Sequence, residues 1–325
     1  MGNLLLVNYI ILFIAEALIL VMTCRLHIGQ ESTHRSAPNH RGFMPSCGGL
    51  VVTVALILYM IENRADLPPS FAAMAVGAGA LCVVSFIDDI RQLTPTLRLL
   101  VQICAVALML SPFVAVHALY ALIIALIFSV GFMNALNFLD GIDGMLAFMG
   151  LVTLGSLAYA LDSVVATPCA RTLAVMAVTV MAALTVFATF NITHKIFAGD
   201  CGSIVLGFVI SYLLVWLIFA TGQFAYVVFI AVCVFDCGMT TLGRLFRGKN
   251  IFQPHRENIY QKLVTDWHVK PLVVSGGYAL LQTAINVLYF TVPTTQRNTC
   301  LIVVCLVLTV TYFILRRAHA PQPRN

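Results

Sequence analysis

Residues 118–132 read ALYALIIALIFSVGF, a run with no charged side chain and no alternation of polar and apolar positions. A helix needs about 20 mainly apolar residues to cross a hydrocarbon core about 30 Å thick. A strand of a membrane β-barrel would instead alternate over about ten residues. Because comparable runs recur along nearly the whole chain, the sequence predicts an all-α polytopic membrane protein and excludes a β-barrel.

The composition agrees with this fold class. Of 325 residues, 61% are hydrophobic and 10% are charged, whereas soluble domains carry about 25% charged residues. We therefore expect residues 1–325 to form a single integral-membrane domain. The ten cysteines lie mainly in apolar runs, without the spacing of a disulfide framework or of a zinc site, so we expect them to pack as small apolar residues.

Eleven membrane helices are predicted from the apolar runs. The first run has neither a basic leader nor a small-residue cleavage site, so we interpret it as a retained helix and not as a signal peptide. The predicted helices are 4–24, 48–61, 70–87, 98–115, 117–136, 145–161, 172–190, 203–220, 223–242, 272–291 and 299–316.

The basic residues predict the orientation of these helices. If the segments after odd-numbered helices face the cytoplasm, they hold fifteen of the eighteen Lys and Arg residues, as the positive-inside rule requires. The N-terminus is then periplasmic, the C-terminus is cytoplasmic, and segments 25–47 and 243–271 are the larger cytoplasmic loops. The net charge of +5 follows from this topology and indicates no nucleic-acid partner.

Acidic residues gather at the same predicted face, beginning with Asp88 and Asp89 at the end of the third helix. Adjacent carboxylates repel each other unless a cation or an arginine offsets them. Such oxygen ligands suit Mg²⁺, which binds one or two carboxylates together with substrate phosphates and water. A solvated helix end beside Arg91 is the alternative interpretation.

A second group of polar residues stands at spacings of three in the segment NALNFLDGIDG, residues 134–144. Asn137, Asp140 and Asp143 offer donors and acceptors that suit a nucleobase, a sugar or the water shell of a metal ion. Residues three apart lie on neighbouring positions of one helix face. A purely structural hydrogen-bond network between helices is the alternative.

A third group occurs in NITHKIFAGDCGS, residues 191–203. Asp200 lies between two glycines just before a predicted helix, whose first N–H groups favour an anion. Lys195 adds a positive charge and Phe197 a surface for stacking. We interpret the segment as a metal-binding carboxylate beside a pyrophosphate site; the alternative is that Asp200 only caps the helix.

The largest loop reads RLFRGKNIFQPHRENIYQ, residues 244–261. Arg244, Arg247 and Arg256 suit phosphate oxygens, and His255 suits phosphate binding or proton transfer. A basic loop that only meets anionic lipid is the alternative. Asp236, inside the ninth helix, is expected to face the bundle interior.

Together these segments resemble the polyprenyl-phosphate N-acetylhexosamine-1-phosphate transferases, glycosyltransferase family 4. The resemblance rests on short motifs that occur in the family's order, namely His40-x-Gly-x-x-Pro-x-x-Gly-Gly49, Asp88-Asp89, Arg98 and Gln102, 134–144, 197–203 and the loop around His255. The loop is most similar to members that start O-antigen synthesis with 6-deoxy sugars, and it lacks the clustered histidines of the peptidoglycan enzyme. The family's Asp-x-Pro-Asn segment upstream of His40 is also absent.

The resemblance implies transfer of a sugar 1-phosphate from a UDP-N-acetylhexosamine to undecaprenyl phosphate in a bacterial inner membrane, with the active site facing the cytoplasm. It also implies Mg²⁺, with Mn²⁺ as a substitute, and leaves homodimerisation and the sugar open, N-acetylfucosamine and N-acetylquinovosamine among the candidates. The implied metal ligands are Asp200, Asp88 and Asp89, which with His255 form the catalytic set. The implied substrate-binding residues are Asn137, Asp140, Asp143, Asn191, Lys195, Phe197, Arg244, Arg247 and Arg256.

Two other classes of protein compete with this interpretation. An ion-coupled transporter would place carboxylates near the middle of the bilayer, where only Asp236 and Glu16 come close. An intramembrane aspartyl protease built on Asp140 and Asp200 would leave Asp88 and Asp89 without a role.

Overall fold

The structure, a computed structural model, describes residues 2–31, 43–63, 67, 69–250 and 255–317. Predicted loop 25–47 therefore lies partly outside the described residues, as does predicted loop 243–271. The described α-helices are α1 Gly2–Arg25, α2 Leu50–Asn63, α3 Pro69–Arg91, α4 Pro95–Leu110, α5 Leu119–Leu139, α6 Met145–Tyr159, α7 Pro168–Asn191, α8 Asp200–Thr221, α9 Ala231–Phe246, α10 Ile259–Thr265, α11 Pro271–Thr291 and α12 Arg297–Arg317.

Every predicted membrane helix is present. Ten helices, including their short extensions, are long and apolar enough to span a membrane, and the shorter α2 is the eleventh apolar helix among the described residues. The boundary between the fourth and fifth helices falls where Ser111 and Pro112 indicated it, since α4 ends at Leu110 and a 3₁₀ turn follows. The prediction of an all-α polytopic membrane protein is confirmed.

Three departures from the predicted elements are small. Strands β1 (Gly29–Glu31) and β2 (Phe43–Pro45) form an antiparallel pair next to the end of α1. The short α10 lies within the predicted loop, and the sixth predicted helix ends in a π-helical turn, Ala160–Val165.

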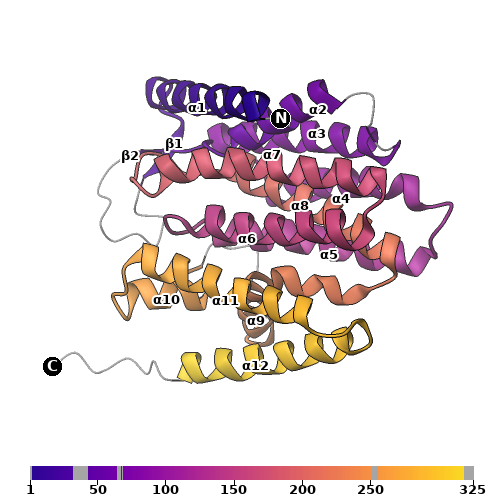
Figure 1. The fold of residues 1–325 in the computed structure, drawn as a ribbon. Coiled ribbons are helices and arrows are strands. Elements are labelled where there is room, and N and C mark those ends of the chain that lie inside the picture. The colour runs from indigo at the N-terminus through magenta and orange to yellow at the C-terminus, as the bar shows by residue number, and fades with distance from the viewer. Residues whose placement is uncertain (1, 32–42, 64–66, 68, 251–254, 318–325) are drawn as a thin grey trace.

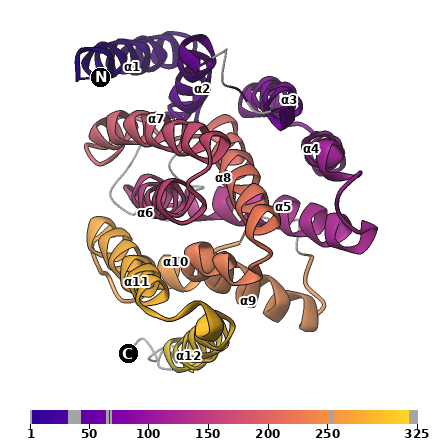
Figure 2. The same ribbon diagram turned by 45° about the vertical axis from the view of Figure 1, so that its right-hand side comes forward.

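The long helices lie roughly side by side in Figure 1, with β1, β2, α10 and the end of α12 at the left of the view. In Figure 2, α7 and α8 lie between the α1–α2 pair and the α5–α6 pair, and α9 to α12 gather on the other side of α5 and α6. Helix α8 is the most buried of the membrane helices and packs against both α3 and α5. Asp200, the first residue of α8, therefore lies among the central helices at one end of the bundle.

The start of α8 also packs closely against the start of α2. A Cβ atom added to Gly49 would lie 2.1 Å from the Cα of Gly202, and one added to Gly202 would lie 2.3 Å from the Cα of Gly49. Only glycine at both positions permits this contact between backbones. The Gly-Gly pair of the first motif therefore serves close packing, and it positions residues 45–49 beside Asp200.

The ninth predicted helix is broken into two parts. A 3₁₀ helix, Phe224–Ile230, precedes α9, and Ile230 has φ −124° and ψ 13°. The side chain of Gln282 accepts a hydrogen bond from Val232 N at 2.9 Å and donates one to Val228 O at 2.9 Å. Broken membrane helices are tolerated where a side chain satisfies the freed backbone groups, and Gln282 does so here.

Large apolar side chains cover the outside of the bundle. Exposed contiguous apolar surface marks contact with a membrane or a partner. On α12 the exposed apolar residues are Ile302, Val303, Leu306, Val307, Val310, Phe313 and Ile314. This surface, with the length of the helices, shows a multi-pass membrane protein.

Candidate active site

An acidic cluster forms where α3, α4 and α8 meet. One guanidinium nitrogen of Arg98, Nη1, lies 2.6 Å from Asp88 Oδ2 and 2.9 Å from Asp200 Oδ2. The two carboxylate oxygens are therefore no farther apart than the sum of these distances. The Asp88 side chain is 6% exposed, the Asp200 side chain 20% and the Arg98 side chain 33%, so Asp200 is the more accessible of the two carboxylates.

The turn between α3 and α4 explains how Arg98 returns to Asp88. Leu93 N donates to Asp88 Oδ1 at 2.5 Å, which closes the end of α3. Thr94 then caps α4 by accepting from Leu97 N, and proline follows at the first helical position. The reversal is three residues long, so the first turn of α4 lies beside the last turn of α3. Positions 88 and 98 therefore meet although ten residues separate them.

Asp89 points to the start of α8. Its Oδ1 accepts from Asp200 N at 3.1 Å, and its Oδ2 accepts from Cys201 N at 3.1 Å. Gly199 precedes this turn with φ +73°, in the left-handed region that favours glycine. The anion that the sequence predicted at this helix start is thus, in this structure, the chain's own carboxylate.

The acidic cluster fits a hard divalent cation on the evidence of its donors. Asp88 and Asp200 present oxygens to one shared point, which Arg98 contacts with a single nitrogen. Mg²⁺ prefers one or two carboxylates together with water and substrate phosphates as ligands. Asp89 takes no part in this contact with Arg98, since its oxygens face the backbone N–H groups of Asp200 and Cys201.

The segment 134–144 closes the cluster on the α5 side. Asn137 Oδ1 accepts from Ser203 Oγ at 2.9 Å, one turn of α8 beyond Asp200. Asp140 is buried at the end of α5. Asp143, 1% exposed, lies 2.7 Å from Nδ1 of the half-exposed His194. The buried Asp143 is therefore connected to the surface by His194, a residue that was not predicted to belong to the site.

The predicted substrate residues of segment 191–197 separate into two groups. Asn191 is buried and joins two loops, accepting from Gly144 N at 2.6 Å and donating to Ile196 O at 3.0 Å. Phe197 is 3% exposed, so its ring is not available for stacking in this structure. Lys195 is exposed and lies over the Phe190 ring. Only Lys195 of this group presents its side chain to a ligand.

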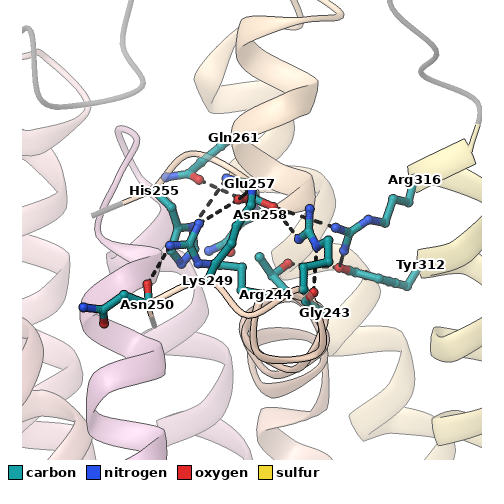
Figure 3. A network of polar contacts seen from close by, with 12 residues as sticks. Gly243, Arg244, Lys249, Asn250, His255, Glu257, Asn258, Gln261, Tyr312 and Arg316 are labelled. Carbon is teal, nitrogen blue, oxygen red and sulfur yellow. Dashed lines mark hydrogen bonds and ion pairs between the residues drawn. The ribbon is translucent and has the colours of Figure 1, made fainter. Parts of the chain in front are cut away.

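A basic cluster surrounds Glu257 at the ends of α9 and α12 (Figure 3). Glu257 accepts hydrogen bonds from Arg244 and Arg247 at 2.6 Å each and from Lys249 at 3.0 Å. Arg316 of α12 approaches it at 3.8 Å. One carboxylate thus contacts four cations, and the surplus of positive charge suits an anionic ligand.

The charges of this cluster shift two pKa values. Partial burial raises the pKa of Glu257, but the hydrogen bonds from Lys249, Arg247 and Arg244 and the charge of Arg247 outweigh it and bring the value to about 2. Burial lowers the pKa of His255 below its ordinary 6.5, and the charges of Arg244 and Lys249 lower it further against the effect of Glu257. At neutral pH, Glu257 is therefore charged and His255 is neutral.

Two contacts connect the basic cluster with the end of α5. The ring of His255 lies 5.8 Å from the ring of Phe138, and Tyr260 of α10 donates to Phe138 O at 2.5 Å. Asp236 anchors α10, because its carboxylate accepts from Ile259 N and Tyr260 N at 2.7 and 3.1 Å. Asp236 is 5% exposed, so its predicted position inside the bundle is confirmed. Both clusters therefore adjoin segment 134–144.

Several residues of the two clusters were not predicted as site residues. Glu257 and Lys249 were visible in the loop sequence, but nothing in the local pattern showed that one acid would gather the bases. Arg316 is far away in sequence, and only the packing of α12 against α9 brings it in. Arg98 was noted as part of a motif without a role. Arg256 lies on the exposed side of the same loop.

The architecture and the two clusters define a class of protein: a multi-pass helical membrane protein with an acidic and a basic site. Residues 71–218 match the model of glycosyl transferase family 4. The chain is also 25% identical, over 75% of its own length and 72% of the relative's, to a protein of Bacillus subtilis (strain 168) named a probable undecaprenyl-phosphate N-acetylglucosaminyl 1-phosphate transferase.

These two findings support the resemblance to the polyprenyl-phosphate N-acetylhexosamine-1-phosphate transferases that was drawn from the motifs. The matched segment contains Asp88, Arg98 and Asp200, whereas the basic cluster around Glu257 lies outside it. The family match therefore covers the acidic cluster and segments 134–144 and 191–203 but not the basic cluster.

Proposed function

We propose that the chain transfers an N-acetylhexosamine 1-phosphate from a UDP-sugar to undecaprenyl phosphate, which yields undecaprenyl-pyrophosphoryl-sugar and UMP. The observation that supports this most is the convergence of Asp88, Arg98 and Asp200 at the end of the bundle. Phosphoryl transfer needs mainly positioning and neutralisation of charge. The two clusters offer these functions, and both adjoin segment 134–144.

Asp88 and Asp200 would hold Mg²⁺, or Mn²⁺ in its place, which when bound neutralises the charge of the pyrophosphate and of the departing UMP. The same two oxygens now contact one nitrogen of Arg98, so the guanidinium would give up these contacts when the ion binds. Asp89 fixes the first turn of α8 and thereby the position of Asp200. In this proposal Asp89 is a positioning residue.

The remaining residues bind and orient the substrates. Arg244, Arg247 and Lys249 offer donors to phosphate oxygens, and neutral His255 offers a hydrogen bond to the sugar or a phosphate. Asn137, Asp140 and Lys195 lie around the nucleotide. The acceptor phosphate oxygen attacks the phosphorus that carries the sugar, and the bond to the UMP oxygen breaks. We favour this direct attack over a covalent aspartyl intermediate because a phosphate monoester is already a nucleophile.

The orientation is part of the proposal. Helix α12 ends at the same end of the bundle as β1, β2 and α10 (Figure 1). Its last residues, Arg316 and Arg317, thus lie with the basic cluster, as the positive-inside rule expects of a cytoplasmic face. We propose a bacterial inner membrane with this face toward the cytoplasm, where UDP-sugars occur.

Two sugars are supported by different observations. The Bacillus subtilis relative is named for N-acetylglucosamine. The His255-Arg-Glu-Asn-Ile-Tyr-Gln261 loop is similar to members that use 6-deoxy sugars in O-antigen or related envelope polysaccharide synthesis. Because the family match does not cover the loop, the loop is where this choice would be made.

The competing classes of protein receive less support. Asp200 is ion-paired with Arg98, which an aspartyl protease built on Asp140 and Asp200 would not permit. Asp236 is engaged with the backbone of α10 and is therefore not free to carry an ion in a transporter.

The test uses the full chain in detergent with undecaprenyl phosphate and radiolabelled UDP-sugars, with and without EDTA. The expected result is a butanol-extractable product from one UDP-N-acetylhexosamine, which EDTA abolishes and Mg²⁺ restores. Turnover that is unaffected by EDTA would reject the metal, and the absence of product from every UDP-sugar would reject the reaction.

A further inference from the structure

Two cysteines from different motifs meet beside the acidic cluster. Cys47 comes directly before Gly48 and Gly49, and Cys201 follows Asp200. Both side chains are 0% exposed, and both are free thiols. The proposed transfer uses neither of them.

The two sulfur atoms share a neighbour in Asp89. Both Sγ atoms and a carboxylate oxygen of Asp89 lie within 4.8 Å of one another. Cys47 Sγ donates to Asp89 Oδ2 at 3.4 Å. This is the one group of three His, Cys, Asp or Glu ligands with such spacing among the residues that the structure describes.

The backbone holds the three groups in place. Phe197 N donates to Pro45 O at 3.0 Å, and Gly48 N and Gly49 N donate to Phe197 O and Ala198 O at 2.8 and 3.0 Å. These bonds tie the Cys47 segment to the loop that leads into Cys201. Asp89 is fixed by its bonds to the first turn of α8. The three ligands therefore need little reorganisation to meet one ion.

The donors suit a different metal from that of the acidic cluster. Two thiolates and one carboxylate select a thiophilic ion, whereas Mg²⁺ prefers oxygen alone. With metal–sulfur bonds of about 2.3 Å and metal–oxygen bonds of about 2.1 Å, neighbouring ligands of a tetrahedral ion lie about 3.6 Å apart. The distance of 3.4 Å from Cys47 Sγ to Asp89 Oδ2 already matches this value.

We propose that Cys47, Cys201 and Asp89 form a binding site for one thiophilic divalent cation of the Zn²⁺ class, separate from the Mg²⁺ site. On binding, the two thiols release their protons to solvent, two metal–sulfur bonds and one metal–oxygen bond form, and water takes the fourth position. No electron is transferred. Because Asp89 Oδ2 also accepts from Cys201 N, the ion would sit at the first turn of α8, next to Asp200.

The test uses Cd²⁺ as the probe on the purified full chain in detergent, after removal of metals. The expected result is an ultraviolet sulfur-to-cadmium charge-transfer band that saturates at one Cd²⁺ per chain. The band should disappear in the Cys47→Ala/Cys201→Ala variant. It should persist in the matched Cys233→Ala/Cys237→Ala variant, which alters the other buried cysteine pair, one helical turn apart on α9.

A second measurement keeps the test decisive if the first variant does not fold. X-ray absorption at the cadmium edge of the Cys233→Ala/Cys237→Ala protein should show two sulfur ligands, with oxygen completing the shell. Absence of the band from the wild type, its loss from the control variant, a shell without sulfur, or a native disulfide between Cys47 and Cys201 would each overturn the proposal.

Discussion

The two charged clusters of this protein have the same arrangement with the signs of the charges exchanged. In the acidic cluster one arginine, Arg98, lies between the carboxylates of Asp88 and Asp200. In the basic cluster one carboxylate, Glu257, lies among four cations. In each cluster the single residue of opposite charge, Arg98 or Glu257, holds the other side chains together. The remaining charge of the cluster suits a ligand of opposite sign.

The clusters also differ in how they are built. The acidic cluster lies at the ends of packed helices, inside the segment that matches the family. The basic cluster lies on a loop and at the ends of α9 and α12, outside that segment. We infer that the first carries the chemistry common to the family, and that the second adapts the site to a particular sugar.

The largest expected effect follows from removing a charge of the acidic cluster. Asp200→Asn should lower kcat/KM by about 10²- to 10³-fold, because a charge that stabilises the transition state is lost. The matched control is Asp162→Asn, an exposed carboxylate 3.7 Å from Arg171 at the other end of α6, which should keep full activity. Equal losses in both variants, or none in Asp200→Asn, would contradict the role of the cluster.

A smaller loss of activity is expected when Arg98, the one basic residue of the acidic cluster, is replaced by a lysine. Arg98→Lys keeps the charge but replaces the rigid, planar guanidinium, one nitrogen of which contacts both carboxylates, by a flexible ammonium group. Since hydrogen bonds to charged groups contribute about 1.5–3 kcal/mol, we expect kcat to fall by about 10- to 100-fold. Arg91→Lys, an exposed arginine on the last turn of α3, is the control. Wild-type kcat in Arg98→Lys would show that Arg98 only balances charge.

The corresponding change in the basic cluster should affect binding more than chemistry. In Glu257→Gln the four cations lose their common partner, so we expect KM for the UDP-sugar to rise about tenfold while kcat stays near that of the wild type. Asp266→Asn, which alters a neighbouring acid on the same segment, is the control. A fall in kcat without a change in KM would place Glu257 in the chemical step.

Thermal unfolding at several pH values sharpens this prediction. The folded pKa of Glu257 is about 2 and its ordinary value is 4.5, so the unfolded chain binds more protons between these values. The stabilisation is complete above pH 4.5 and is lost as the pH falls toward 2. The Tm difference between wild type and Glu257→Gln should therefore stay constant from pH 5 to 8 and shrink below pH 4.5; a difference that changes near neutrality would contradict this.

The last expected effect, similar in size to that of Glu257→Gln, concerns His255. Its pKa lies below 6.5, so the imidazole is neutral at pH 7 and becomes charged only in more acidic solution. If the neutral ring binds the substrate, kcat/KM should fall on the acid side of pH 6.5. In His255→Gln this fall of kcat/KM at acid pH should be absent, and kcat/KM at neutral pH should be about tenfold lower than in the wild type. If kcat/KM of the variant still falls at acid pH as in the wild type, another group is responsible for the pH dependence.

Most of the fold was predictable because hydropathy is a local property. Each apolar run became a helix, and the turn at Ser111 and Pro112 was visible from residue type alone. Helix α10 was missed because its seven residues are too few and too polar for a membrane pattern. Its signal was present as a capping box, Asn258 with Gln261 three residues later.

The site was predictable in its residues but not in its pairings. The motifs brought Asp88 and Asp200 forward as candidates, and the structure brings them together. The direction of Asp89 depends on the start of α8, more than a hundred residues away, and no local pattern contains it. For the same reason Asn191 and Phe197 were expected in the site but pack between loops.

The most direct test of the acidic cluster is to locate Mn²⁺ by anomalous diffraction in crystals of the full chain grown with a UDP-sugar. We expect one peak between Asp88 and Asp200, about 2.1 Å from a carboxylate oxygen of each. The absence of a peak between Asp88 and Asp200, with Mn²⁺ bound only elsewhere, would contradict the account.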